Sequence, residues 1–318
     1  MAVLTSGRRR MVAPAAGEDA GEPSAPPWLI RSLWDLVRPH QWTKNGICFA
    51  GVIFSGRFTE GLAVMSACAA CVVFCAASSA VYVLNDILDR GRDRRHPRKC
   101  LRPIASGAVP IPLAAGLGLV LASAGMAGAW CLGRMAFVCL LLYLVNNVAY
   151  SVRLKHLALF DVLCITFGFV LRLAAGTYAV GELPTTWIVL CSFSLAAFLG
   201  FAKRRAELSA LQPEERMQRP VLSKYSLQYL DSLIGSSANM AVMSYALFTT
   251  ASGKNPSLIL TLPIVYYAIM HYKRLVMLAD SGEEPDVILL KNRRIHVCIA
   301  LWLASYLVIW KGDLHIFR

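Results

Sequence analysis

Four polar residues at helical spacing form the most chemically informative group in this sequence. Asn85, Asp86, Asp89 and Asp93 follow a long, nearly uncharged apolar run, and Tyr82 lies one turn before them. Residues three and four positions apart lie above one another on a helix, so a helix would present the whole group on one side. Acids without a counter-charge at the edge of the hydrocarbon are energetically costly. They therefore normally bind a cation or serve a function. The pattern therefore predicts a polar site where a membrane helix leaves the bilayer.

A strongly basic stretch follows these acids, and Lys99 and Arg102 are its last two bases. Mg²⁺ prefers oxygen ligands and commonly combines one or two carboxylates with substrate phosphate oxygens. Asn85 and Asp89, one turn apart, are the predicted Mg²⁺ ligands. Lys99 and Arg102 would neutralise phosphate, and the hydroxyl of Tyr82 would donate to a phosphate or a sugar. Surface ion pairs in a basic membrane loop are the alternative interpretation.

A second polar group lies downstream of residue 150. Asp161 and Arg172 share a helix face, and Arg172 would lie deep in a span, where an unpaired guanidinium is expensive. We expect Arg172 to pair with an acid or to bind a phosphate, and a structural Asp161–Arg172 pair is the alternative.

The composition is that of an integral membrane protein. Hydrophobic residues make up 57% of the 318 positions, 16% are charged, and the mean hydropathy is +0.53, whereas soluble domains are about 25% charged. The net charge of +13 comes from bases clustered in short loops, which indicates membrane topology and anionic ligands rather than nucleic acid. The ten cysteines are scattered through apolar runs, which argues against a zinc or redox site.

Apolar runs long enough to cross a bilayer as helices divide the chain after a tail. Residues 1–27 contain no signal-peptide core and are expected to be a disordered cytoplasmic tail, followed by one transmembrane domain over 28–318. The nine predicted spans are 41–56, 61–84, 110–131, 134–151, 160–180, 185–202, 232–252, 256–272 and 296–311.

Charge alternates between the loops of this pattern. With the N-terminus inside, the loops after spans two, four, six and eight are basic, and the other loops are poor in bases. Cytoplasmic loops of membrane proteins carry the excess of Lys and Arg. The alternation therefore favours nine spans, an external C-terminus, and chemistry on the cytoplasmic side of the plasma membrane.

Six ordered blocks of this sequence resemble the UbiA superfamily of intramembrane prenyltransferases, and its phosphoribosyltransferase branch most closely. The blocks are RPHQWTKN, YVLNDILDRGRDRRHPRKCLRPIASG, YSVRLKH, DVLCITFGFVLRLAAG, KRRAEL and EPDVILLKNR. The resemblance implies an all-α membrane fold of nine helices around a central cavity with cytoplasmic cap loops. It also implies Mg²⁺-dependent transfer of phosphoribose from phosphoribosyl diphosphate to a polyprenyl phosphate, of the kind that supplies lipid-linked sugars for the cell envelope.

Two positions depart from the family pattern. Ordinary members carry a second acidic motif, D-x-x-x-D, whereas Ile165 stands four residues after Asp161, which favours the phosphoribosyl branch. Cys100 replaces a base between Lys99 and Arg102. The rival functions are prenyl transfer from a prenyl diphosphate to an aromatic or other acceptor and, in a different class, transport.

These considerations predict a set of site residues, and they leave the oligomeric state open, a homo-oligomer included. The expected catalytic residues are Asn85, Asp86, Asp89, Asp93 and Asp161. The expected substrate-binding residues are Lys44, Tyr82, Lys99, Arg102, Tyr150, Lys155, Arg172 and Lys203.

Overall fold

The computed structural model describes residues 27–97, 99–210, 221–251, 253, 255–278, 291–312 and 316, and this part of the chain is helical, with no strand. The predicted tail, apart from Pro27, and the acidic part of the EPDVILLKNR block lie outside the described residues. The α-helices are α1 (Pro27–Val37), α2 (Ala50–Phe54), α3 (Gly61–Asp93), α4 (Pro103–Ser106), α5 (Ile111–Leu132), α6 (Arg134–Val152), α7 (Phe160–Ala179), α8 (Thr186–Ala210), α9 (Leu227–Ala251), α10 (Leu262–Leu278) and α12 (Arg293–Lys311). Short 3₁₀ helices connect them: η1 (Pro39–Phe49), η2 (Arg57–Thr59), η3 (Lys99–Leu101), η4 (Leu154–His156), η6 (Leu222–Lys224) and η7 (Pro256–Thr261).

Six of the described helices are long and apolar enough to cross a membrane, namely α3, α5, α6, α7, α8 and α12. Each of the nine predicted spans overlaps a helical segment. Three of these segments, however, are not both long enough and apolar enough to be among the six. The first is mostly the 3₁₀ helix η1, α10 has only 17 residues, and α9 carries Ser, Asn and Thr residues along its length. The chain is a multi-pass membrane protein.

Helix α3 is the longest element and carries the predicted polar group. Its 33 residues run on to Asp93, beyond the end of the predicted span at residue 84, and the helix stops shortly before Pro97. Small residues let its neighbour approach closely: a Cβ added at Gly118 of α5 would lie 3.3 Å from Val83 Cγ1. The polar group therefore stands on a rigid helix end packed against α5.

The first predicted span is built mostly from η1, which packs very closely against α7. A Cβ on Gly176 of α7 would lie 2.1 Å from the carbonyl oxygen of Cys48, and one on Gly51 would lie 2.6 Å from the Cα of Thr177. This close approach buries Asn45 completely in the bundle. Arg38, at the start of η1, has a left-handed φ of 53°, which turns the chain from α1 into η1.

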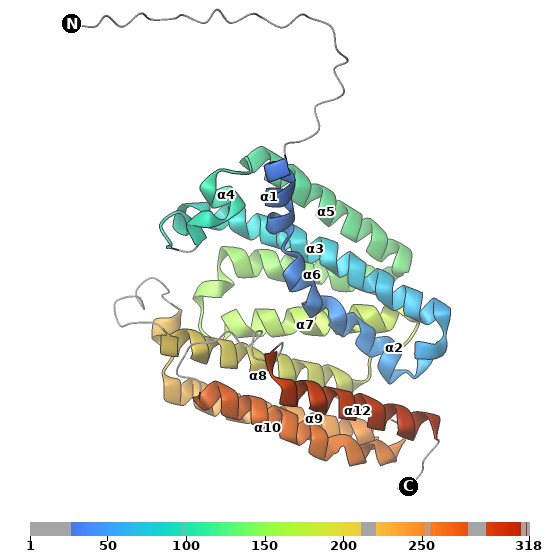
Figure 1. Cartoon of the computed structure of the whole chain (residues 1–318). Coiled ribbons are helices and arrows are strands. Elements are labelled where there is room, and N and C mark those ends of the chain that lie inside the picture. Colours follow the sequence, from blue (N-terminus) through green and yellow to red (C-terminus); the bar gives the residue numbers. More distant parts are fainter. Residues whose placement is uncertain are drawn as a thin grey trace, which may run out of the picture.

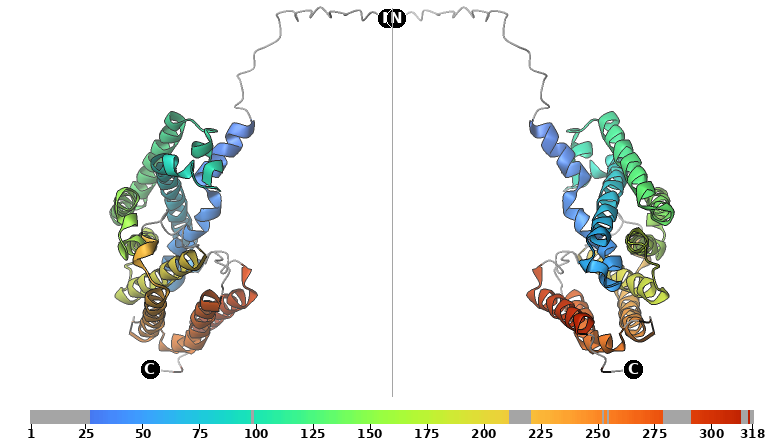
Figure 2. Two further views of the ribbon diagram at one scale, coloured as in Figure 1. Left: turned by 90° about the vertical axis from the view of Figure 1, so that its left-hand side faces the viewer. Right: turned by 90° about the vertical axis from the view of Figure 1, so that its right-hand side faces the viewer.

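The long helices lie roughly side by side, from α5 and α3 at one end to α9, α10 and α12 at the other (Figure 1). Seen from the sides, α10 and α12 turn away from the row formed by the earlier helices (Figure 2). The last helix reaches the first segment, since the hydroxyl of Tyr306 donates to the carbonyl oxygen of Ile53 at 3.0 Å and the rings of Phe54 and Trp302 are 5.9 Å apart. These contacts join α2, near the start of the chain, to α12, its last described helix.

Candidate active site

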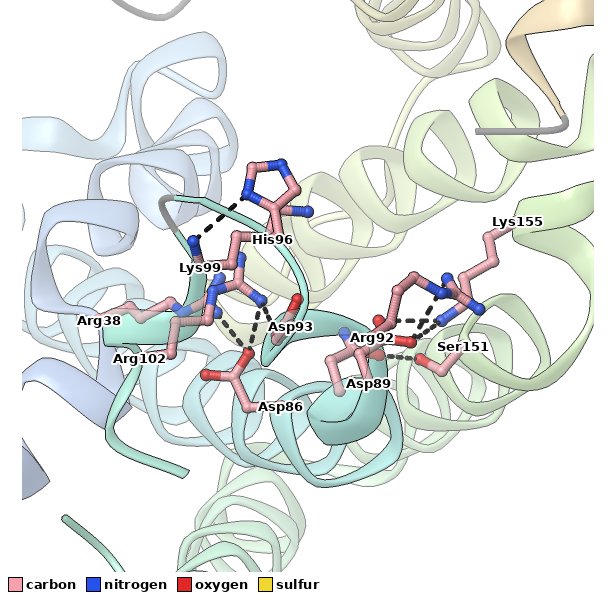
Figure 3. Close-up of polar contacts among 11 residues, drawn as sticks. Arg38, Asp86, Asp89, Arg92, Asp93, His96, Lys99, Arg102, Ser151 and Lys155 are labelled. Carbon is pink, nitrogen blue, oxygen red and sulfur yellow. Dashed lines mark hydrogen bonds and ion pairs between the residues drawn. The ribbon is translucent and has the colours of Figure 1, made fainter. Parts of the chain in front are cut away.

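The polar residues at the end of α3 separate into two groups with different partners (Figure 3). In the first group, Asp86 and Asp93 are each 2% exposed. Arg102 Nη1 lies 3.1 Å from Asp86 Oδ1 and 2.7 Å from Asp93 Oδ2. Arg38 Nη2 lies 2.5 Å from the same oxygen of Asp86, and its guanidinium stands 5.0 Å above the ring of Tyr82. Two arginines from outside α3 thus neutralise two buried acids.

Removing Arg102 should destabilise the protein, because Arg102 is a cation that contacts both buried acids. Arg102→Met should lower the free energy of unfolding by about 3–5 kcal/mol, the usual cost of breaking a buried ion pair. Denaturant unfolding in detergent would measure this loss. Arg95→Met, at an exposed position nearby, is the matched control, and equal stability of the two variants would contradict the expectation.

The second group contains Asn85 and Asp89, and its partners come from the end of α6 and from η4. Lys155 Nζ lies 2.9 and 3.0 Å from the two carboxylate oxygens of Asp89, and Arg92 lies 3.7 Å from one of them. The hydroxyl of Ser151 donates to Asn85 Oδ1. One short segment, residues 151–155, therefore contacts both predicted metal ligands.

The residues present at the second group fit a Mg²⁺ ion that is shared with a substrate. Asn85 and Asp89 offer an amide and a carboxylate oxygen one turn apart, and both side chains are partly exposed. Within the described ranges, no group of three or more His, Cys, Asp or Glu residues could hold a metal ion. Mg²⁺ typically completes its octahedron with phosphate oxygens and water. This donor set suits an ion that arrives with a diphosphate.

His156 adds a pH-sensitive group beside Lys155. Partial burial, and then the positive charges of Lys155 and Arg92, hold the pKa of His156 below its ordinary value of 6.5. Folding therefore favours the neutral imidazole. Its contribution to stability is present above pH 6.5 and is lost as the pH falls through the lowered pKa of the folded protein.

Acidification should accordingly destabilise the wild type more than the His156→Gln variant. The measurement is the thermal midpoint of each protein between about pH 7.5 and about pH 5.5, the range in which histidine titrates. His40→Gln, at an exposed position in η1, serves as the control. A pH dependence unchanged by His156→Gln would contradict this account.

Asp161 lies apart from both groups, fully buried at the start of α7. Its Oδ2 lies 2.7 Å from Arg204 Nε of α8, and its Oδ1 accepts a 2.7 Å hydrogen bond from the hydroxyl of Tyr225. The alternative of an Asp161–Arg172 pair is wrong. Eleven residues of helix separate the two by about 16 Å along the axis.

Arg172 is buried among neutral partners. Its Nε donates to Asn45 Oδ1 at 2.7 Å, its Nη2 donates to the hydroxyl of Tyr143 at 2.8 Å, and its guanidinium stands 4.5 Å above the Tyr143 ring. No acid among the described residues forms an ion pair with it, so the expected acidic partner is absent there. A guanidinium held this deep by neutral partners is suited to an anion.

The remaining predicted residues lie on several elements. Tyr150, at the end of α6, lies close to Arg204, whose positive charge acts on its hydroxyl. Lys44 precedes Asn45 in η1, and the backbone N–H of Lys99 in η3 donates to His96 Nδ1 at 3.4 Å. Lys203 lies in α8 beside Arg204, partly buried, and no hydrogen bond or ion pair joins it to the other described site residues.

Several residues of this region were not assigned to the site from the sequence. Arg38 and Asn45 belong to the quoted RPHQWTKN block and Ser151 to YSVRLKH, so their positions within these blocks were the available signal. The sequence neighbours of Tyr143 and Tyr225 are apolar or mixed, and they contain no motif that would have assigned either tyrosine to the site.

Comparison with known proteins places the chain in a family. The model of the UbiA prenyltransferase family matches residues 46–293. The decaprenyl-phosphate phosphoribosyltransferase of Mycolicibacterium smegmatis is 30% identical over 306 residues, covering 91% of this chain and 95% of that protein. The protein of the same name from Mycobacterium tuberculosis is 32% identical over 290 residues, covering 87% and 93%.

The fold agrees with the sequence matches. The solved structure of a UbiA homologue from Archaeoglobus fulgidus, bound to DMAPP and Mg²⁺, has a TM-score of 0.70 and 18% identity, and the match covers 88% of this chain and 99% of that chain. At this identity the likeness shows the shared fold. The family model spans most of the chain, and two relatives match nearly its whole length. The chain is therefore a membrane transferase that belongs to the UbiA prenyltransferase family.

Proposed function

We propose that this enzyme transfers the 5-phosphoribosyl group of phosphoribosyl diphosphate to the phosphate of a polyprenyl phosphate and releases pyrophosphate. The observation that carries the proposal is the pair of Mg²⁺-suited ligands, Asn85 and Asp89, beside the ammonium of Lys155. The second acid of the region, Asp161, faces Arg204 instead, and the apolar Ile165 follows it one turn later. One cation site and several bases suit one diphosphate and one lipid monophosphate. The names of the relatives support the same reaction.

The chain's own residues bind and orient the two phosphorylated substrates. An oxygen of the lipid phosphate attacks the anomeric carbon, the C1–O bond breaks, and the electron pair leaves with pyrophosphate. Asn85 and Asp89 would hold Mg²⁺, which stabilises the charge of the leaving diphosphate when it is bound. Lys155 supplies fixed positive charge next to these ligands. The attacking phosphate is already ionised near pH 7, so the reaction requires no general base.

The other predicted residues take supporting roles in this proposal. Asp86 and Asp93 hold Arg38 and Arg102 at the edge of the site. Arg172 offers a deep positive charge to a phosphorylated substrate. The other proposed substrate contacts are Lys44, Tyr82, Lys99, Arg102, Tyr150 and Lys203.

We further propose nine spans within a domain over residues 28–318, with cytoplasmic caps around a central cavity. Observed contacts support the assignment of loops to sides. Arg57 Nη1 donates to the carbonyl oxygen of Val180 at 2.5 Å, which joins two loops assigned to the outside. Lys224 Nζ lies 3.4 Å from the carbonyl oxygen of His156, which joins two loops assigned to the cytoplasm.

Cysteine labelling would test this topology. In a Cys-depleted background, Arg92→Cys and Lys224→Cys should react with an impermeant reagent only from the cytoplasmic side of the plasma membrane, and Glu182→Cys only from outside. Labelling of the first two from outside would overturn the proposed sidedness.

The decisive assay of function compares two pairs of substrates. Purified enzyme in detergent with Mg²⁺ receives either phosphoribosyl diphosphate and polyprenyl phosphates, or a prenyl diphosphate and aromatic acceptors, and products are identified by mass. We expect a polyprenyl-phosphate phosphoribose and free pyrophosphate from the first pair. A prenylated aromatic product, with phosphoribosyl diphosphate left intact, would favour the rival prenyl transfer.

A further inference from the structure

Each oxygen of the Asp161 carboxylate has a protein group 2.7 Å away, one as an ion pair and one as a hydrogen bond. Arg204 Nε lies 2.7 Å from Oδ2, and the hydroxyl of Tyr225 donates to Oδ1 at 2.7 Å. The same Tyr225 oxygen accepts a hydrogen bond from the backbone N–H of Leu159 at 2.6 Å. Three segments, α7, α8 and the residues before α9, thus enclose a side chain with no exposed surface.

The cation on Asp161 is itself fixed from a second direction. Arg204 is 8% exposed, and its Nη1 lies 2.6 Å from Glu207 Oε2, one helical turn further along α8. A guanidinium held between two carboxylates in a poorly solvated place is strongly retained, because leaving would break two ion pairs at once. A divalent cation at Oδ2 of Asp161 would have to displace this doubly held guanidinium from a buried place. Lys155 also contacts its acid, but the side chains of Lys155 and Asp89 are 15% and 25% exposed, so that pair can open to admit a cation.

The contacts of Asp161 and Arg204 lead through Tyr150 to Asn85 and Asp89, the two residues suited to bind Mg²⁺. Tyr150 lies close to Arg204, and the positive charge of the guanidinium acts on the Tyr150 hydroxyl. The next residue is Ser151, whose hydroxyl donates to Asn85 Oδ1, and Lys155 on the following turn contacts Asp89. The path from Asp161 therefore ends on the segment that contacts both Asn85 and Asp89.

We infer that Arg204 is the permanent counter-cation of Asp161, that Asp161 is a positioning residue, and that a divalent cation binds only at Asn85 and Asp89. The guanidinium takes the place that a second metal ion would need. Asp161 then acts through Arg204 and Tyr150 on the placement of Ser151 and Lys155. The inference rests on the proposed function and specifies its metal requirement.

Counting bound Mn²⁺ tests the inference without a turnover. The purified full chain is titrated with Mn²⁺ in the presence of inorganic pyrophosphate and followed by electron paramagnetic resonance. We expect about one Mn²⁺ per chain, with the spectrum of an isolated ion. A spin-coupled pair of Mn²⁺ ions would overturn the inference. The wild-type spectrum alone decides the count, so the test does not depend on whether any variant folds.

Two variants locate the bound ion. Asp89→Asn should weaken Mn²⁺ binding at least about tenfold, whereas Asp161→Asn should change it by less than about twofold. The matched control is Asp231→Asn, whose partner Arg205 (Nε to Oδ1, 2.5 Å) is the neighbour of Arg204. An equal loss of Mn²⁺ binding in Asp161→Asn and Asp89→Asn would assign Asp161 to a metal site and refute the inference.

A kinetic comparison tests the positioning role. Asp161→Asn should lower kcat about tenfold, because Lys155 is misplaced, and leave the Mg²⁺ concentration for half-maximal activity unchanged. Arg204→Gln should cause a larger loss of thermal stability, since it strands a buried carboxylate, and adding Asp161→Asn should restore part of it. An unchanged kcat in Asp161→Asn, or no recovery in the double variant, would contradict the role. Failure of the proposed function would look different: Mn²⁺ and pyrophosphate would bind as expected, but no phosphoribosylated lipid would form.

Discussion

Asp89→Ala should reduce phosphoribosyl transfer by at least about 10³-fold, because losing a metal position removes several kcal/mol of transition-state stabilisation. Asn85→Ala should show a loss of the same kind, as its amide oxygen is the other proposed ligand. Asp89→Ala also leaves Lys155 without the acid that it contacts at 2.9 Å. The rate of lipid product formation over a range of Mg²⁺ concentrations measures the effect.

The control for Asp89→Ala is Glu60→Ala, which removes an acid paired with Arg57 on the loop assigned to the outside. This variant should retain wild-type turnover. Asp93→Ala should lose less activity than Asp89→Ala, since Asp93 is engaged by Arg102 in the other polar group. Full activity of Asp89→Ala at saturating Mg²⁺ would remove the metal hypothesis.

Arg172→Met should weaken the binding of a phosphorylated substrate by about 2–5 kcal/mol, the usual cost of removing one partner of a desolvated charge pair. The guanidinium is held by Asn45 and Tyr143, so it is pre-oriented yet not neutralised by them. Each 1.4 kcal/mol is about a tenfold change in affinity, so the dissociation constant should rise at least about 25-fold. Equilibrium binding of phosphoribosyl diphosphate and of polyprenyl phosphate, each measured alone, would identify the substrate concerned.

Arg134→Met is the control for Arg172→Met, because Arg134 is an exposed base at the far end of α6. It should bind both substrates as the wild type does. The Arg172→Met variant could instead bind both substrates with wild-type affinity and only unfold more easily. Arg172 would then be a structural residue that holds η1 against α7.

The sequence allowed good prediction of elements that depend on local spacing. The helical spacing of Asn85, Asp86, Asp89 and Asp93 correctly placed them on one helix. The same spacing also divides the four residues into two pairs on the helix surface, and this division was not recognised from the sequence. At about 100° per residue, Asp86 and Asp93 point in nearly the same direction, and Asn85 and Asp89 form a second, neighbouring stripe. The two groups in Figure 3 follow these two stripes.

Partners that are distant along the chain could not be predicted in the same way. Arg204 lies far downstream of Asp161, and nothing in the spacing within α7 indicates that α8 delivers its cation. Arg172 was expected to pair with an acid or to bind a phosphate, because charge is costly in a bilayer, and its hydrogen bonds to the neutral Asn45 and Tyr143 were not predicted. The close approach of Gly176 to Cys48 in η1 is likewise a tertiary contact that the spacing of residues does not reveal.

The contact between the last helix and the first segment has a consequence for how the protein is made. The hydroxyl of Tyr306 and the carbonyl oxygen of Ile53 are separated by 253 residues. At translation rates of about 5–20 residues per second, Tyr306 emerges roughly 10 to 50 s after Ile53. During that interval Phe54 has no Trp302 ring to pack against. The first segment to enter the membrane is therefore among the last to complete its packing, and a chain interrupted before α12 would leave it unfinished.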